Sequence, residues 1–272
     1  MKNITLLLLL ISGFLYCQKT HRFFYEVNFK RDALGAYPAK DVVVLEINKD
    51  SNIFLSNEYL VTDSINNVHK DDQSFAYPNF TQVIEYKKSD DSFDFINILS
   101  SKYYQFNTKK KINWTISNEK KKIGNFNVTK ATAEYGGRNW TAWFSPDIPF
   151  PYGPYVFYGL PGLILDIADD KDNYHFSFIQ NKSYETELNS EHIIKDLFSD
   201  SKINIKEKDW AKVQINYYKN PIANYKNGES YMVKDSGEKY TQNDYRDYEK
   251  ALQNQIKKLN NPIEISEKID YK

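Results

Sequence analysis

The side chains best suited to chemistry lie together in the middle of the chain. Arg138, Trp140 and Trp143 follow closely on one another, with Glu134 just before them and Asp147 just after. A guanidinium can pair with a carboxylate or stack on an indole ring, and two carboxylates can act as a general acid and a general base. This cluster could therefore clamp the structure, bind a ligand or catalyse a reaction.

The two tryptophans of this cluster cannot both be ordinary core residues of a one-sided sheet. Trp140 and Trp143 are three positions apart, so in a strand they point to opposite faces. One of them must be covered by another segment or be available to a ligand. Structural clamping is the simplest account and a binding surface is the second. Catalysis by Glu134 with Asp147 is the third, because the sequence does not give their separation. The candidate binding surface is Arg138, Trp140, Trp143, Tyr155 and Phe157.

Familiar catalytic and metal-binding patterns are missing from the sequence. It has no glycine-rich phosphate loop and no HExxH, CxxC or GxSxG motif. His21, His69, His175 and His192 do not have ligand spacing, whereas a zinc site usually needs three or four convergent ligands. The acidic segment 169–173 lacks the glycine and the distal glutamate of a calcium loop. We therefore expect no metal and no cofactor, and we assign no catalytic residue.

The first 17 residues have the pattern of a secretory signal peptide. Lys2 precedes an apolar run at 4–15, which is shorter than the roughly 20 residues needed to span a bilayer. Cys17, the only cysteine, is either lipidated or removed with the signal, and removal is favoured because the large Tyr16 precedes it. We expect an exported protein of the periplasm or cell envelope, or a secreted one, with no transmembrane span in the mature chain.

The charge balance argues against nucleic acid as a partner. The sequence has 36 basic and 36 acidic residues, and loss of Lys2 with the signal leaves 35 against 36. Such a chain creates no overall field that would attract nucleic acid or an anionic membrane. The expected partner is an envelope protein or an apolar ligand.

Alternation of apolar and polar residues dominates the chain to about residue 183 and predicts a mainly β fold. The expected strands are 21–30, 41–48, 51–59, 81–88, 92–99, 102–107, 111–117, 124–135, 139–144, 163–168 and 174–180. The paired glycines of 135–138 are typical of a hairpin turn, and 118–123 is interpreted as another turn. Because short links join antiparallel neighbours, we expect a large curved antiparallel sheet, either a meander or a partial barrel.

The pattern becomes helical after residue 184. A helix is expected at 189–200, the segment 207–221 is ambiguous between helix and strand, and 242–262 has the strongest helical period. The apolar stripe of this last helix should pack on the sheet, and consists of Tyr245, Tyr248, Leu252, Ile256 and Leu259. Residues 18–272 should form a single β-rich domain, with a central meander at 112–183 and a helical part at 184–272.

Prolines and glycines make the connection at 146–162 stiff. Proline fixes φ and donates no ladder hydrogen bond, so this segment cannot be a central strand. Leu160 to Leu163 has the sequence of a type II turn, with Pro161 second and Gly162 third. We therefore predict that Gly159, Pro161 and Gly162 are structural turn residues that direct a buried strand beginning at Leu163.

The same region carries a family resemblance. The stretch GLPGLIL at 159–165 resembles the signature of the GLPGLI family, exported proteins of flavobacteria and their relatives. The surrounding frame is similar over roughly 112–180, and NNPIEI at 260–265 resembles the family's tail. The matching frame residues are Trp114, Ile123, Gly124, Lys130, Ala131, Gly137, Arg138, Trp140, Ala142, Trp143, Ile148, Pro149, Gly153, Pro154 and Phe157. Members often have a cysteine just before the lysine–alanine pair, where this chain reads FNVTKA. The resemblance implies an exported β-rich protein, and the family has no established activity.

We expect a non-enzymatic binding or assembly module of the cell envelope that uses its aromatic-rich sheet and the 146–162 connection. One alternative is an envelope hydrolase whose acid and base groups include Glu134, Asp147 or Asp166. The other is a purely structural envelope component, which should pack tightly around its tryptophans and lack a pocket of ligand size.

Overall fold

The computed structural model describes residues 20–272 except 70–73, 101, 199–201 and 229. They form a 12-stranded sheet in the order β12-β6-β5-β4-β3-β2-β1-β11-β10-β9-β8-β7, which is not closed into a barrel. The strands are β1 (Thr20–Lys30), β2 (Pro38–Ile47), β3 (Ser51–Ser56), β4 (Val83–Lys87), β5 (Ser92–Leu99), β6 (Lys102–Thr108), β7 (Thr115–Ile123), β8 (Phe126–Tyr135), β9 (Arg138–Ser145), β10 (Leu163–Asp169), β11 (Tyr174–Tyr184) and β12 (Lys202–Asn204). The prediction of a mainly β fold on a large antiparallel sheet is confirmed; the short β12 departs from it by pairing in parallel with β6.

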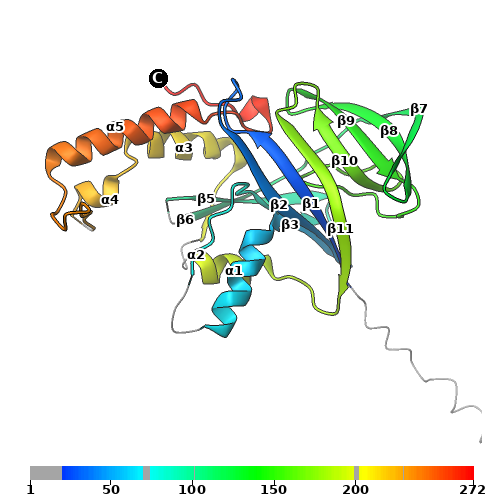
Figure 1. Cartoon of the computed structure of the whole chain (residues 1–272), viewed down its shortest axis with the longest axis horizontal. Helices are drawn as coiled ribbons and strands as arrows, with labels where there is room; N and C mark the ends of the chain where they lie inside the picture. The colour runs from blue at the N-terminus through cyan, green and yellow to red at the C-terminus, as the bar shows by residue number, and fades with distance from the viewer. Residues whose placement is uncertain (1–19, 70–73, 101, 199–201, 229) are drawn as a thin grey trace, which may run out of the picture.

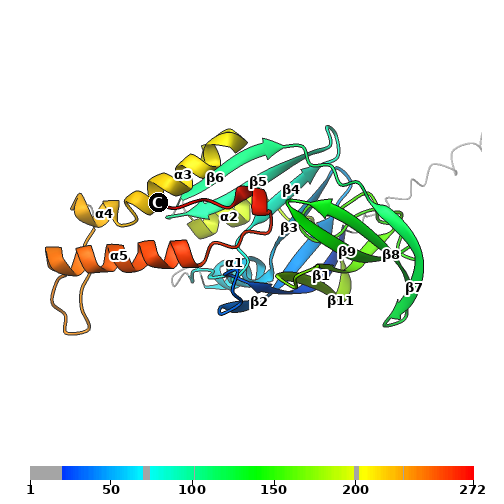
Figure 2. The same ribbon diagram turned by 90° about the horizontal axis from the view of Figure 1, so that it is seen from above.

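Two meanders meet at β1 to build this sheet. Strands β1 to β6 pair in sequence order, as do β7 to β11. Strand β1 is antiparallel to both β2 and β11, with a register shift between Phe24 and Tyr25 on the β11 side. One apolar core takes residues from both meanders. The sheet therefore curls around that core (Figures 1 and 2).

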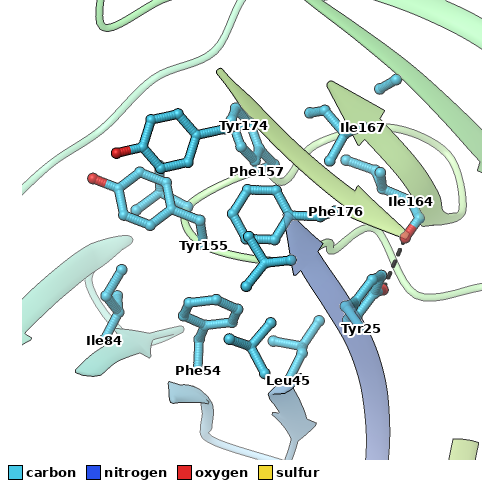
Figure 3. Packing of buried hydrophobic residues seen from close by; sticks show 14 of the residues in the cluster. Tyr25, Leu45, Phe54, Ile84, Tyr155, Phe157, Ile164, Ile167, Tyr174 and Phe176 are labelled. Carbon is cyan, nitrogen blue, oxygen red and sulfur yellow. Dashed lines mark hydrogen bonds between the residues drawn. The ribbon is translucent and has the colours of Figure 1, made fainter. Parts of the chain in front are cut away.

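The main core lies on the inner face of the curl and is rich in aromatic rings. Phe80 packs edge-on against Phe54 and Phe176, with ring centroids 5.8 Å apart in both pairs. The hydroxyl of the fully buried Tyr25 donates to the carbonyl oxygen of Ile164 at 2.8 Å (Figure 3). Burial raises the pKa of Tyr25, so this hydroxyl keeps its proton and remains a donor. The bond fixes β1 against β10 at the centre of the sheet.

A second apolar cluster covers the outer face of β3 to β5. Helices α1 (Asn57–Val68) and α2 (Ser190–Phe198) supply Tyr59, Ile193 and Ile194 to it, and the strands supply Ile53 and Ile96. The side chain of Ser56 caps α1 by accepting from the backbone N–H of Glu58 at 3.1 Å. The sheet thus has apolar packing on both of its faces in this region.

The C-terminal part forms a helical arm beside β5 and β6. It contains the 3-10 turn η1 (Glu207–Asp209), α3 (Trp210–Lys219), α4 (Ala223–Lys226) and α5 (Gln242–Lys258). Figures 1 and 2 show α3, α4 and α5 extending beyond the sheet, while the following chain returns to it through η2 (Ile265–Glu267). Thr241 and Asp244 form a capping box at the start of α5. No helix within the described ranges is long and apolar enough to cross a membrane.

The apolar stripe of α5 does not lie flat on the sheet. Tyr245 packs within the arm, with its ring centroid 6.0 Å from that of Tyr225 and 5.5 Å from that of Tyr240. Leu252, Ile256 and Leu259 face a groove between the arm and the sheet. None of the residues of α5 is fully buried. The stripe is shared between the arm's own packing and this groove.

Two other local expectations are corrected by the structure. The segment 118–123 is not a turn but the second part of β7, and the chain instead reverses at Gly124, whose φ is +55°. Because β7 is an edge strand, its exposed lysines are of the kind that discourage pairing with another chain. The ambiguous segment 207–221 is helical and forms η1 and α3.

The corner that precedes β10 is tighter than a type II turn. The N–H of Gly162 donates to the carbonyl oxygen of Leu160 at 2.8 Å, and the N–H of Leu163 donates to the carbonyl oxygen of Ile148 at 3.0 Å. A type II turn would need the N–H of Leu163 to bond to Leu160 instead, so that turn does not form. Gly162 has a φ of +150°. The expected outcome is nevertheless confirmed, because Leu163 begins a strand whose first three residues are buried, followed by the half-buried Asp166.

Candidate functional site

Four of the five residues predicted to form a binding surface lie inside the protein. Arg138, Trp140, Tyr155 and Phe157 are each at most 4% exposed. Trp143 points to the other face of β9, is half-buried, and has the Lys121 ammonium 4.2 Å from its ring centroid. The prediction of an accessible surface at these residues is therefore corrected. The 146–162 connection covers Trp140, because the ring of Phe157 lies 4.6 Å from its indole.

Arg138 binds the chain's own C-terminal tail, which we define as residues 260–267. Its Nε donates to the carbonyl oxygen of Ile263 at 2.8 Å. Its Nη2 donates to Asn261 Oδ1 and to the carbonyl oxygen of Pro262, both at 2.8 Å. Its Nη1 forms a buried ion pair with Asp169 at 3.0 Å. The guanidinium thus holds the tail against the β9–β10 hairpin.

Tyr155 binds the same tail from inside the core. The hydroxyls of Tyr155 and Tyr135 donate to Glu264 Oε1 at 2.8 and 2.7 Å. Lys110 pairs with Glu264 Oε2 at 3.2 Å. Burial, followed by the charge of Glu264, raises the pKa of both tyrosines, so they remain donors. Figure 3 shows the hydroxyl of Tyr155 pointing the same way as that of Tyr174, which donates to the carbonyl oxygen of Asn261 at 2.5 Å.

The carboxylates considered for catalysis do not converge. Glu134 on β8 lies opposite Asn139, near the start of β9, whereas Asp147 lies beyond the end of β9. Both are exposed. Asp166 lies on β10 opposite Trp143, between these two positions. Glu134 and Asp147 therefore cannot act on one bond as a general acid and a general base.

Asp166 belongs to a small polar cluster with His175 and Ser177. His175 Nε2 lies 2.8 Å from Asp166 Oδ2 and 3.1 Å from Ser177 Oγ. The hydrogen bond to Asp166 raises the pKa of His175, although burial opposes this. In a proton relay the serine and the aspartate contact different ring nitrogens, whereas here both contact Nε2. The cluster has the composition of a catalytic triad without its geometry.

The space beside Tyr155 and Phe157 of the predicted binding surface is too small for a ligand. The gap between the 152–158 segment and β3 to β5 has a volume of about 20 Å³, which is room for little more than one water molecule. A groove with a volume of about 500 Å³ lies instead between the arm and the sheet. We call it the arm groove.

Aromatic rings form the floor and walls of the arm groove. Phe29 stacks on Tyr174 with an interplanar angle of 7°, and Phe80 meets Phe29 edge-on at 89°. These three rings are buried, whereas Trp210 and Tyr217 on α3 are half-buried at the wall. Trp210 also contacts Tyr104, at 5.8 Å between ring centroids. The groove is thus lined by an ordered floor and by partly accessible rings.

Amide side chains provide most of the polar lining of the arm groove. Asn260 donates to the carbonyl oxygen of Ile269, and Asn261 is held by Arg138 and by the carbonyl oxygen of Lys30. Arg31 donates to Asn79 Oδ1 at the groove's edge. The remaining amides of the lining are Gln82, Asn97, Gln214 and Gln255. Within the described ranges, no three metal-ligating side chains form a group that could hold an ion.

Glu267 is the carboxyl group of the arm groove. Burial and the nearby charges of Glu264 and Glu207 raise its pKa to about 7, while Lys110 acts in the opposite direction. The ordinary value for glutamate is 4.5. Near neutral pH this carboxyl is therefore protonated in a large fraction of molecules and can donate a hydrogen bond.

The arm groove was missed because its lining is spread over distant segments. Trp210, Gln214 and Tyr217 share one helix face at steps of four and three, which is visible once 207–221 is taken as a helix. The apolar stripe of α5 is visible in the sequence, but its period alone predicts packing on the sheet. The sequence contains no signal that places residues 79–82 and 97–99 opposite these helices.

Comparisons with known proteins agree with the fold and leave the function open. A family model described as a protein of unknown function (Porph_ging) matches residues 137–166, which run from the β8–β9 turn into β10. No curated protein matches the chain.

Two solved structures of PNGF-II, in space groups P21 and C2, resemble the chain. Both have a TM-score of 0.50, with sequence identities of 15% and 14%. The alignment covers 71% of this chain but only 32% of the PNGF-II chain. At this identity the likeness is one of fold.

Proposed function

We propose that the protein is an exported, non-enzymatic binding module of the cell envelope and that the arm groove is its ligand site. The observation that carries the proposal is a groove of about 500 Å³ lined by partly accessible aromatic rings and by amides. Ligand pockets are usually concave, apolar at the base and roughly 300–1,000 Å³ in volume, with a few polar groups that orient the ligand. The arm groove has each of these properties.

Membership of the GLPGLI family is part of the proposal. The stretch at 159–165 supports it, as does the contact between the two segments that carry the resemblance, since Arg138 binds Asn261, Pro262 and Ile263. Export to the periplasm, to the envelope or outside the cell is supported by the signal-like sequence of residues 1–17. These residues, including Cys17, lie outside the described part of the chain.

The alternatives have weaker support. A hydrolase that uses Glu134 with Asp147 is disfavoured because these carboxylates lie at opposite ends of β9. A purely structural component predicts no pocket of ligand size, whereas the arm groove has one. An apolar ligand or envelope protein at the 146–162 connection is disfavoured because Tyr155 and Phe157 are buried.

A thermal-shift screen tests the proposed function. Neutral oligosaccharides, short peptides and fatty acids would be added to the mature protein and to the variant Ile256→Trp, which places a bulky ring in the groove. A ligand that binds only the folded state raises Tm, by an amount that grows with the logarithm of one plus the ratio of the free ligand concentration to Kd. We expect one compound class to raise Tm of the wild type and not of the variant. A screen in which no class raises Tm, or in which the variant responds equally, would contradict the proposal.

A further inference from the structure

Four amide side chains in the arm groove have hydrogen-bonding capacity that the fold does not use. Among the described residues, Gln82, Gln214 and Gln255 make no side-chain hydrogen bond, and Asn97 Nδ2 is buried without a partner. A buried donor that is left without a partner destabilises the folded protein. Each amide offers both donors and an acceptor. The unused groups therefore suit a ligand that itself presents donors and acceptors side by side.

The amides alternate with ring surfaces that remain partly accessible. Trp210, Gln214 and Tyr217 follow one face of α3, so an amide lies between two aromatic rings along the same wall. Tyr271 supplies another half-buried ring from the end of the chain. A ligand that fits this wall has flat apolar C–H faces and polar edges. A pyranose ring has both, because its C–H groups lie on its faces and its hydroxyls lie around its rim.

Building on the proposed function, we infer that the arm groove binds an oligosaccharide, with Trp210 and Tyr217 contacting sugar faces and Gln214 bonding to hydroxyl groups. The groove is lined by two side chains that can carry a charge, Arg31 and Glu267, and by the four amides whose hydrogen-bonding groups the fold leaves free. This ratio favours a hydroxyl-rich ligand over one held mainly by ion pairs. The raised pKa of Glu267 adds a neutral donor below about pH 7.

Isothermal titration with chitotriose, cellotriose and mannotriose tests this ligand class in the full mature protein. An alanine–serine hexapeptide serves as the comparison ligand. We expect at least one trisaccharide to bind, and Gln214→Ala to weaken it about fivefold, the effect of losing one hydrogen bond. Asn216→Ala is the matched control, because Asn216 is an exposed amide on the same helix and does not line the groove. Alanine favours helix at both positions, so neither variant should unfold α3.

Fluorescence provides a second readout. Trp210 is the tryptophan of the groove, so a bound trisaccharide should change the emission of the wild type and not that of Trp210→Phe. Three results overturn the inference: no trisaccharide binds, Gln214→Ala binds as tightly as Asn216→Ala, or only the hexapeptide binds. In the last case the proposed function stands with another ligand class. If none of the trisaccharides, peptides or fatty acids binds, both fail.

Discussion

Arg138 illustrates how a residue chosen for ligand chemistry can instead serve the protein's own chain. Its side chain is almost completely buried and makes four hydrogen bonds, one of them to the carboxylate of Asp169. Burial opposes the ionisation of Asp169, but hydrogen bonds from Asn173 and Tyr174 and the charge of Arg138 lower its pKa. The three partners of Arg138 in the tail lie more than 120 positions away along the chain, Ile263 being 125 residues distant. Sequence patterns cannot identify such a partner.

Replacing Arg138 should therefore destabilise the whole protein. In Arg138→Met the carboxylate of Asp169 loses its buried cation and three acceptors of the tail lose their donor. We expect a loss of about 3–5 kcal/mol in the free energy of unfolding, measured by chemical denaturation, because an unpaired buried charge remains. Arg246→Met is the control, since Arg246 is exposed on α5, and should change stability by less than about 0.5 kcal/mol. Equal losses in the two variants would mean that the tail contact contributes little.

At the scale of elements, prediction from the sequence succeeded where local pattern determines structure. The strand that begins at Leu163 and the glycine hairpin between β8 and β9 follow from alternation and from turn chemistry, and Gly136 and Gly137 have φ values of +60° and +79°. The lysine-rich composition of 118–123 predicts a turn, whereas the segment belongs to β7, because an exposed edge strand and a turn have similar composition. The arm groove was missed because its walls come from six separate segments, whose meeting depends on long-range packing.

Gly162 connects local conformation with this packing. A Cβ at this position would lie 2.1 Å from the carbonyl oxygen of Ser145, and the φ of +150° is one that other residues rarely adopt. At Gly237, whose φ is +84°, a Cβ would have no atom within 4 Å. Gly162→Ala should therefore lower the free energy of unfolding by about 2 kcal/mol more than Gly237→Ala. Both variants strain the backbone at the substituted residue, but only at position 162 must the backbone of Ser145 and Pro146 also move. Urea denaturation of both variants measures the difference, and equal losses would show that the corner can relax.

At the scale of the whole molecule, the tail joins the arm to the sheet. Lys110, between β6 and β7, pairs with Glu207 of the arm at 3.1 Å and with Glu264 of the tail at 3.2 Å. Burial opposes the charge of Lys110, but the two carboxylates raise its pKa. Tyr135 at the end of β8 and Tyr155 in the 146–162 connection both donate to Glu264. Glu267 lies beside this network and adds a third carboxyl group, which the structure accommodates best when it is protonated.

The stability of the protein should therefore depend on pH through Glu267. Its pKa is about 7 in the folded protein and 4.5 ordinarily, so the folded state holds this proton more tightly than the unfolded state does. The resulting stabilisation is fully present below about pH 4.5 and is lost as the pH rises through 7. The free energy of unfolding of the wild type, relative to that of Glu267→Gln, should fall by roughly 3 kcal/mol over this interval.

Urea denaturation at a series of pH values, performed on the wild type and on Glu267→Gln, measures this difference directly. Subtracting the two profiles removes the contributions of the other carboxylates, which both proteins share. Glu134→Gln is the control, because Glu134 is exposed at the end of β8, and its profile should run parallel to that of the wild type. If Glu267→Gln also runs parallel to the wild type, then Glu267 is not held among Glu264, Glu207 and Lys110 in solution. The junction of tail, arm and sheet would then have to be looser than the structure has it.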